Sequence, residues 1–146
     1  MCNAPVPHRT IKVGDVVIPG VVGLAPLAGY TEYPFRSLVA QFGCPFAITP
    51  LVSAEALCRG REATRALLRT GPEDADVLAV QLFGARPEIM AEAAASIGTG
   101  FPILDINCGC AVPKVIKQNA GAALLGDLNR LRAVARAVVA RASVPV

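Results

Sequence analysis

One short segment of this sequence holds the side chains best suited to chemistry. In the string LDINCGCAVPK, residues 104–114, Asp105 and Asn107 alternate with apolar residues, and a glycine precedes Cys110. Alternation places Asp105 and Asn107 on one face of a strand, and the break at Gly109 leaves Cys110 in the loop above that face. A thiol there can donate a proton to a carbon centre or act as a nucleophile, so Cys110 is the candidate reactive residue.

The residues around Cys110 leave several roles open. Cys108 and Cys110 form a C-x-C pair, but no further cysteine or histidine lies near them in the sequence to complete a metal site, so we predict no bound metal. Lys114 and Lys117 follow the cysteines closely. Their charges suit lowering the pKa of the thiol or binding a phosphate group, and they suit an ordinary solvated surface equally well.

Two other strand ends carry groups that a ligand could use. Gln81 closes the apolar run at 76–82, on the same face as Val77 and Ala79. A core-facing glutamine needs partners for its carbonyl and its amine, which either a heterocycle edge or a protein network supplies. The segment APLAG at 25–29 is small and exposes its backbone, which suits close approach of a flat ring or a phosphate, or simply a tight turn.

The elements that would position these groups alternate along the chain. Short apolar runs interleaved with stretches of helical periodicity indicate a parallel sheet built by right-handed crossovers. The runs span residues 21–26, 45–50, 76–82, 102–107 and 144–146, and the helix candidates span 33–42, 53–69, 86–97 and 127–142. We therefore predict one parallel sheet with the runs in chain order, preceded by a short hairpin around Gly14. Ala28, Gln81 and Asn107 should lie at the same end of that sheet.

The pattern predicts the α/β class and about four βα units, the first half of a (β/α)8 barrel. A closed barrel needs eight strands and roughly 200 residues or more, whereas this sequence of 146 residues reaches the start of a fifth strand. We expect a flexible tail at 1–9 and a partial barrel domain at 10–146. A half-barrel would leave inward residues such as Val77 and Ala79 without facing partners, and its open sheet edge would favour self-association.

Composition limits the class of protein. Fourteen Lys and Arg against eleven Asp and Glu give a net charge of +3, too small to demand a nucleic-acid partner, and 53% hydrophobic residues exclude disorder. No apolar run approaches the roughly 18 residues of a membrane span, and the start of the chain does not resemble a secretory signal. Five cysteines without secretory context favour free thiols in a reducing compartment. These features predict a cytoplasmic protein without a membrane partner.

Several strings together resemble the tRNA-dihydrouridine synthases, over about residues 13–146. They are APLAGYTEYPFR (25–36), VSAEAL (52–57), VQLFG (80–84) and DINCGCAVPKVIKQNAGAALL (105–125). The resemblance implies an FMN-binding barrel followed by a small helical domain. It also implies a flavoprotein oxidoreductase that uses NADPH to reduce uridine to 5,6-dihydrouridine during tRNA processing.

The resemblance also implies roles for single residues. Cys110 matches the cysteine that protonates C5 of the uracil ring, and Asn107 matches an asparagine at the floor of the site. Gln81 matches the glutamine that hydrogen-bonds the isoalloxazine ring. The segment Pro26, Leu27 and Ala28 matches the backbone that lies against the flavin, and Lys114 and Lys117 are the candidate residues for binding the RNA substrate.

The matched strings depart from the family pattern at three places. Ala111 replaces the proline that follows the cysteine, Cys108 replaces a methionine or leucine, and Pro50 replaces a glutamate. A missing proline frees φ and loosens the loop, which affects positioning more than chemistry. Two alternatives remain at this stage: a catalytically inactive half-barrel that acts by associating with itself or a partner, and another FMN barrel such as a dihydroorotate dehydrogenase. We expect the 146-residue chain alone to be inactive.

Overall fold

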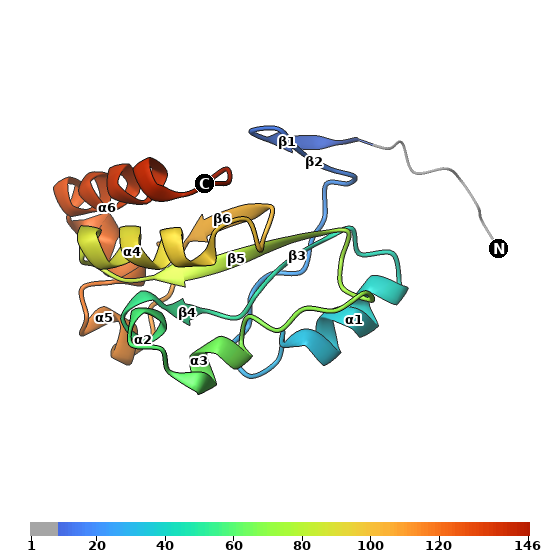
Figure 1. Ribbon diagram of the computed structural model, residues 1–146, viewed down its shortest axis with the longest axis horizontal. Helices are drawn as coiled ribbons and strands as arrows, with labels where there is room; N and C mark the ends of the chain where they lie inside the picture. Colours follow the sequence, from blue (N-terminus) through green and yellow to red (C-terminus); the bar gives the residue numbers. More distant parts are fainter. Residues whose placement is uncertain (1–8) are drawn as a thin grey trace.

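The computed structural model describes residues 9–146; residues 1–8, nearly all of the expected tail, lie outside that part. The strands are β1 (Ile11–Val13), β2 (Val16–Ile18), β3 (Phe46–Ile48), β4 (Val52–Ser53), β5 (Val77–Phe83) and β6 (Ile103–Ile106) (Figure 1). The helices are α1 (Tyr33–Gln41), α2 (Ala54–Cys58), α3 (Glu62–Ala66), α4 (Pro87–Ile97), α5 (Pro113–Ile116) and α6 (Leu128–Arg141), and Gly121–Gly126 form a 3₁₀ segment, η1. None of the helices in the described range is long and apolar enough to cross a bilayer.

A four-stranded parallel sheet is built around β5. Both β3 and β4 pair with one edge of β5, and β6 pairs with the other. Leu24 forms a parallel bridge to Ala47 in β3, and the backbone N–H of Leu104 in β6 donates to the carbonyl of Pro145 at 2.9 Å. The five apolar runs therefore lie across the sheet in chain order, as predicted.

The first and last runs are less regular than expected. The prediction of a full strand over 21–26 is wrong, because that run, which lies wholly within the described residues, joins the ladder only through the bridge at Leu24. Val21 and Val22 are 58% and 75% exposed, so they do not form a strand buried on both faces. The run at 144–146, also within the described part, likewise contributes the hydrogen bond at Pro145 and no assigned strand.

The predicted single helix over 53–69 is also wrong. The structure has the short strand β4 followed by α2 and α3, and Gly60 between the two helices has a φ of +67°. A residue in this left-handed conformation ends a helix, which is why glycine suits the position. The Ser53 hydroxyl accepts a hydrogen bond from the Ala56 N–H at 3.3 Å and so caps α2. The segments α5 and η1 were not predicted.

The longer helices α1, α4 and α6 lie within one or two residues of their predicted bounds. A proline occupies the first turn of α1 and of α4, where its missing N–H costs nothing, and Asp127 caps α6 by accepting from the Arg130 N–H at 3.0 Å. Helices α4 and α6 lie side by side against the outer face of the sheet (Figure 1). Their buried residues join the outward side chains of β5 and β6 in the main core: Leu78, Val80, Leu82, Met90, Ala93, Ala94, Leu104, Val134 and Val138.

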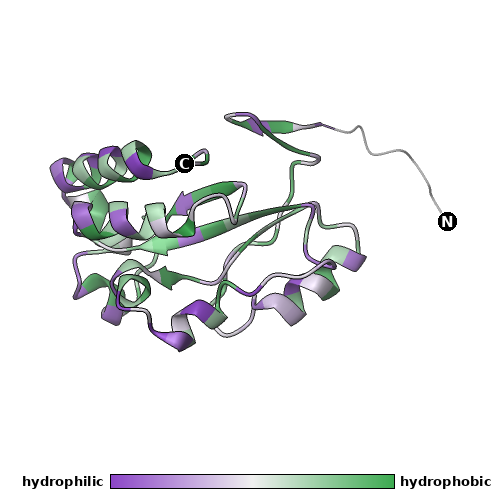
Figure 2. Ribbon diagram, in the orientation of Figure 1, coloured by the Kyte–Doolittle hydropathy of each residue, from purple (hydrophilic) through white to green (hydrophobic). Residues whose placement is uncertain are grey.

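Strand β5 is buried along its whole length, as its unbroken apolar run predicted. It is coloured green for most of its length in the hydropathy view (Figure 2). On the inner face Val77, Ala79 and Ile103 pack against Ile18 of the β1–β2 hairpin. The expectation that Val77 and Ala79 lack facing partners is therefore wrong, because the predicted hairpin folds over the amino-terminal ends of β5 and β6.

Candidate active site

A chain of hydrogen bonds runs along the carboxyl ends of β5 and β6. The Gln81 Nε2 donates to Asp105 Oδ2 at 2.6 Å, and the Asn107 Nδ2 donates to Gln81 Oε1 at 3.1 Å. The backbone N–H of Cys110 then donates to Asn107 Oδ1 at 3.0 Å. Three of the predicted site residues, Gln81, Asn107 and Cys110, are thus held together at one end of the sheet.

The sheet register produces this arrangement. Gln81 and Asp105 are direct partners in the β5–β6 ladder, and the N–H of Asn107 extends that ladder by donating to the Leu82 carbonyl at 2.9 Å. Because side chains alternate along a strand, Gln81, Asp105 and Asn107 all face inward. The Gln81 backbone N–H donates to the Thr49 hydroxyl at 3.1 Å, which ties the end of β3 to the same place.

The Cys110 loop is fixed on its other side by η1. The Cys110 carbonyl accepts from the Ala122 N–H at 3.0 Å, and the side chain packs with Phe83, Val115 and Ala120. Gly121 has a φ of +61°, and a Cβ at this position would overlap the Cys110 carbonyl oxygen. Only glycine therefore allows η1 to approach the loop so closely.

We expect Gly121→Ala to destabilise the protein by about 1–3 kcal/mol, the cost of a side chain in a left-handed conformation, increased by the overlap with the Cys110 carbonyl. Urea denaturation measures the change. The matched control is Gly109→Ala in the same loop, because a Cβ there meets no atom within 4 Å. Equal unfolding midpoints for the two variants would contradict the contact between η1 and the loop.

Cys108 lies in a different electrostatic environment. Burial raises the pKa of its thiol, and the negative charge of Asp105 raises it further. The folded state therefore binds the thiol proton more tightly than the unfolded state does. The resulting stability is complete below the ordinary thiol pKa and is lost as the pH rises through the raised value.

We expect Cys108 to react with iodoacetamide only at a pH above that needed for an ordinary cysteine, because the thiolate is the reactive form. Replacing Asp105 by asparagine removes the neighbouring charge and should shift the reaction to lower pH. Mass spectrometry after alkylation across a pH series locates the modified cysteine. An unchanged profile in Asp105→Asn would show that the carboxylate does not act on this thiol.

The segment Pro26 to Ala28 lies on a separate loop, after the bridge at Leu24. The Leu27 N–H donates to the Thr31 hydroxyl at 2.9 Å, and the same hydroxyl donates to the Leu27 carbonyl at 3.1 Å. These reciprocal bonds close a turn that leaves Leu27 57% exposed and Ala28 exposed. Leu27 and Ala28 are thus accessible as predicted, although the Leu27 N–H and carbonyl are occupied by the hydrogen bonds of the turn.

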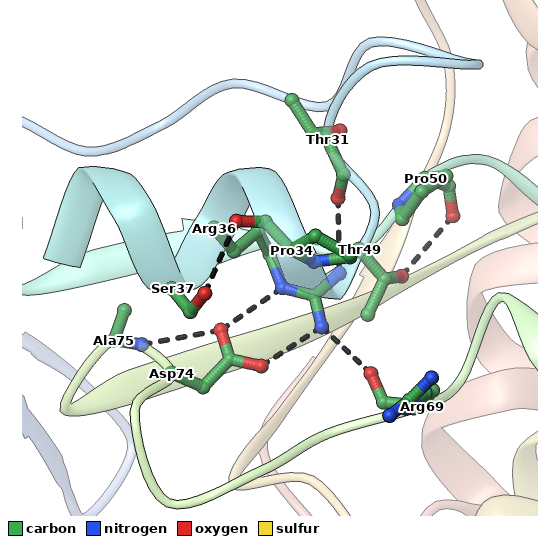
Figure 3. Close-up of polar contacts among 9 residues, drawn as sticks. All are labelled: Thr31, Pro34, Arg36, Ser37, Thr49, Pro50, Arg69, Asp74 and Ala75. Carbon is green, nitrogen blue, oxygen red and sulfur yellow. Dashed lines mark hydrogen bonds and ion pairs between the residues drawn. The ribbon is translucent and has the colours of Figure 1, made fainter.

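A buried arginine holds this turn in place (Figure 3). The Arg36 guanidinium donates to the Thr31 carbonyl at 2.9 Å and to the Arg69 carbonyl at 2.8 Å. It also makes two parallel bonds to the Asp74 carboxylate, at 3.0 and 2.8 Å, and its side chain is fully buried. Arg36 thus joins the turn after the first run to the loop that precedes β5.

Sequence reasoning placed Gln81, Asn107 and Cys110 together correctly, and it missed the residues that support them. Lys114 and Lys117 are exposed on and just after α5, on the segment that follows Cys110. The missed residues are Thr49, Asp105 as the partner of Gln81, Gly121, and the pair of Arg36 and Asp74. The alternation of Asp105 with Asn107 was a signal for the first pairing, whereas no local pattern marks the others.

Comparison with known proteins adds an independent observation. The family model described as Dihydrouridine synthase (Dus) matches residues 23–146, which is most of the chain. The chain belongs to the dihydrouridine synthase family. A probable tRNA-dihydrouridine synthase of Treponema pallidum is 38% identical over 133 residues, covering 90% of this chain and 39% of that protein. The tRNA-dihydrouridine synthase B proteins of Pseudomonas syringae and Vibrio cholerae are each 35% identical over 138 residues, covering 93% of this chain and 40% and 42% of theirs.

The chain spans about two fifths of the length of the curated relatives it matches. Membership of the dihydrouridine synthase family implies a TIM barrel, and the parallel sheet with its outer helices is consistent with part of one. The range matched by the family model includes the strings at 25–36 and 105–125, which contain the turn at Leu27 and the loop at Cys110. Among FMN barrels, the comparisons favour a dihydrouridine synthase over a dihydroorotate dehydrogenase.

Proposed function

We propose that this protein takes part in the reduction of uridine to 5,6-dihydrouridine in tRNA, with FMN as cofactor and NADPH as reductant. The observation that carries the proposal is the hydrogen-bond chain that holds the Cys110 backbone beside Gln81 and Asn107. Active sites of parallel α/β barrels lie at the carboxyl ends of the strands, and the hydrogen-bond chain lies at the carboxyl ends of β5 and β6. Family membership supports the same reaction.

The residues at this edge fit an isoalloxazine ring. Each amide of Gln81 and Asn107 uses one N–H and one oxygen lone pair in the chain, so each retains a second N–H and a second lone pair. A flavin ring edge presents both acceptors and a donor, which such amides can match. The turn from Pro26 to Ala28, in which Leu27 and Ala28 are exposed, offers a surface without bulky polar groups for a flat ring.

In the proposed mechanism, Gln81, Asn107 and the turn at Leu27 would hold a flavin, which when reduced would supply hydride to C6 of the uracil ring. Cys110 donates its thiol proton to C5, so that hydride and proton together saturate the C5–C6 bond. Asn107 and η1 fix the backbone of Cys110 from two sides, which keeps the thiol in one position. The ammonium groups of Lys114 and Lys117 would bind phosphates of the tRNA.

The direct test measures dihydrouridine in tRNA by mass spectrometry after incubation with the protein, FMN and NADPH. The test uses this chain alone and a full-length relative that carries the same site residues. We expect the full-length relative to form the product only when FMN and NADPH are both present, and this chain alone to form none. A full-length relative that neither binds FMN nor forms the product would overturn the proposal, and product formed by this chain alone would overturn the expectation that it is inactive.

A second candidate is a non-catalytic half-barrel that associates with another copy of itself. The favouring observation is the exposed apolar surface beside the first run: Val21 is 58%, Val22 75% and Phe42 85% exposed. Leu24 pairs with β3 on one side of the first run, and an unpaired strand edge is a template for pairing with another chain.

If this second candidate holds, light scattering after gel filtration should give a dimer at micromolar concentration and little retained flavin. Val22→Lys places a charge on the exposed edge and should shift the protein toward the monomer. The control Val17→Lys changes a β2 residue that is 45% exposed, away from the first run. A monomer at all concentrations would contradict self-association.

A further inference from the structure

We propose that Asp105 is a positioning residue that sets the direction of the hydrogen-bond chain ending at the Cys110 backbone. The chain contains two side-chain amides, Gln81 and Asn107, and each amide can rotate by half a turn to exchange its oxygen and nitrogen. A group at one end of the hydrogen-bond chain must therefore determine whether the oxygen or the nitrogen of each amide faces a given neighbour. The inference rests on the proposed function for the role of Cys110 as a proton donor. Its other steps rest on the hydrogen bonds in the structure.

The two ends of the chain have fixed hydrogen-bonding character. An ionised carboxylate only accepts hydrogen bonds, so Asp105 requires Gln81 to present its nitrogen, which it does at 2.6 Å. The backbone N–H of Cys110 only donates, so it requires Asn107 to present its oxygen, which it does at 3.0 Å. Between them, Gln81 Oε1 accepts from Asn107 Nδ2 at 3.1 Å. A single orientation of both amides satisfies every contact.

The reverse orientation is excluded by burial as well as by charge. Gln81 is only 6% exposed, so water does not readily replace a lost partner. Turned around, its oxygen would face the Asp105 carboxylate and its nitrogen would face the Asn107 nitrogen. Within residues 9–146 no buried side-chain nitrogen or oxygen lacks a partner, which agrees with a chain in which every amide atom makes at least one hydrogen bond.

Orientation at Gln81 determines where the Cys110 loop can lie. A reversed Asn107 would place its NH₂ group against the Cys110 N–H, two donors in contact, and the loop would have to move away. Asp105 therefore acts on the Cys110 loop through the side chains of Gln81 and Asn107. Within the hydrogen-bond chain, its own carboxylate contacts only Gln81. Its charge also raises the pKa of Cys108, and so helps to keep that neighbouring thiol protonated.

The test uses a set of variants that break and then restore the direction of the chain. Gln81→Glu places a second carboxylate against Asp105, and Asp105→Ala removes the acceptor. The double variant Asp105→Asn with Gln81→Glu restores a donor and an acceptor at the first link, with the positions reversed. The carboxylate that the double variant carries at position 81 still accepts from Asn107, so Asn107 still offers its oxygen to Cys110.

The readout is hydrogen exchange of the Cys110 backbone amide, followed by NMR without flavin or tRNA. We expect Asp105→Ala to speed this exchange by freeing Gln81 to reverse, and Gln81→Glu to speed it because two adjacent carboxylates repel and move position 81 away from Asn107. Each effect should be at least about fivefold, the factor given by one net hydrogen bond of about 1 kcal/mol. The double variant should return to within about twofold of the unmodified protein. If a single variant does not fold, melting temperatures replace exchange, and the double variant should melt above Gln81→Glu.

Two results would overturn the inference. Exchange at Cys110 that is the same in all variants would show that the chain does not position the loop. A double variant as fast, or as unstable, as Gln81→Glu would show that Asp105 acts through something other than hydrogen-bond direction. Because neither readout needs a cofactor, a protein that fails to form dihydrouridine can still pass this test, and the two proposals fail separately.

Discussion

In a full-length relative that carries the same loop, Cys110→Ala should lower the rate of uridine reduction by roughly 10² to 10⁴, the usual contribution of a positioned general acid. The thiol is the proposed source of the proton for C5, and alanine has no proton to give. The loop should keep its place, because Asn107 and η1 hold the backbone of residue 110 by hydrogen bonds that the alanine variant retains. Reduction of FMN by NADPH, measured from the flavin absorbance, should therefore be unchanged.

The matched control for this prediction is Cys108→Ala, two residues away in the same loop. Burial and the charge of Asp105 raise the pKa of the Cys108 thiol. The hydrogen-bond chain that ends at the Cys110 backbone does not include the Cys108 backbone. Its replacement should change the rate of dihydrouridine formation by less than about threefold. The opposite result, a large loss in Cys108→Ala with Cys110→Ala active, would assign the proton to Cys108.

The sequence predicted best where one pattern dominates over several turns or a whole strand. The run at 76–82 is unbroken and apolar, and β5 is buried at every residue as a result. The helical period at 86–97 and 127–142, with Pro87 and Asp127 at the starts, placed α4 and α6 within two residues. At 53–69 a similar period continues across Gly60, and its positive φ divides the segment in a way that periodicity does not reveal.

The candidate site likewise combines contacts that the sequence predicted with contacts that it did not. Gln81 and Asn107 were placed together because side-chain alternation and parallel pairing fix which strand ends meet. The contact of Gly121 with the Cys110 carbonyl depends on how η1 folds back, which no local pattern encodes. The pair of Arg36 and Asp74 joins residues 38 positions apart, and each residue alone resembles an ordinary surface charge.

Arg36→Ala should destabilise the protein by about 3–5 kcal/mol, the cost of leaving one member of a buried ion pair without its partner. The guanidinium is fully buried and makes bonds to Thr31, Arg69 and Asp74, so its removal strands the Asp74 carboxylate and two carbonyl oxygens. Denaturant titration measures the change. The exposed pair of Arg86 and Glu55 gives the control, because Arg86→Ala should cost no more than about 1 kcal/mol.

The effect of Arg36 should extend to the turn that carries the proposed flavin contacts. Its bond to the Thr31 carbonyl supports the residue whose hydroxyl closes the turn at Leu27, so loosening that bond should also weaken FMN binding. Replacing the pair together, Arg36→Met with Asp74→Leu, removes the stranded charge and should recover much of the lost stability. FMN affinity should stay low in that double variant, because methionine cannot donate to Thr31. Full recovery of both stability and FMN affinity would show that Arg36 supports the fold without positioning the turn.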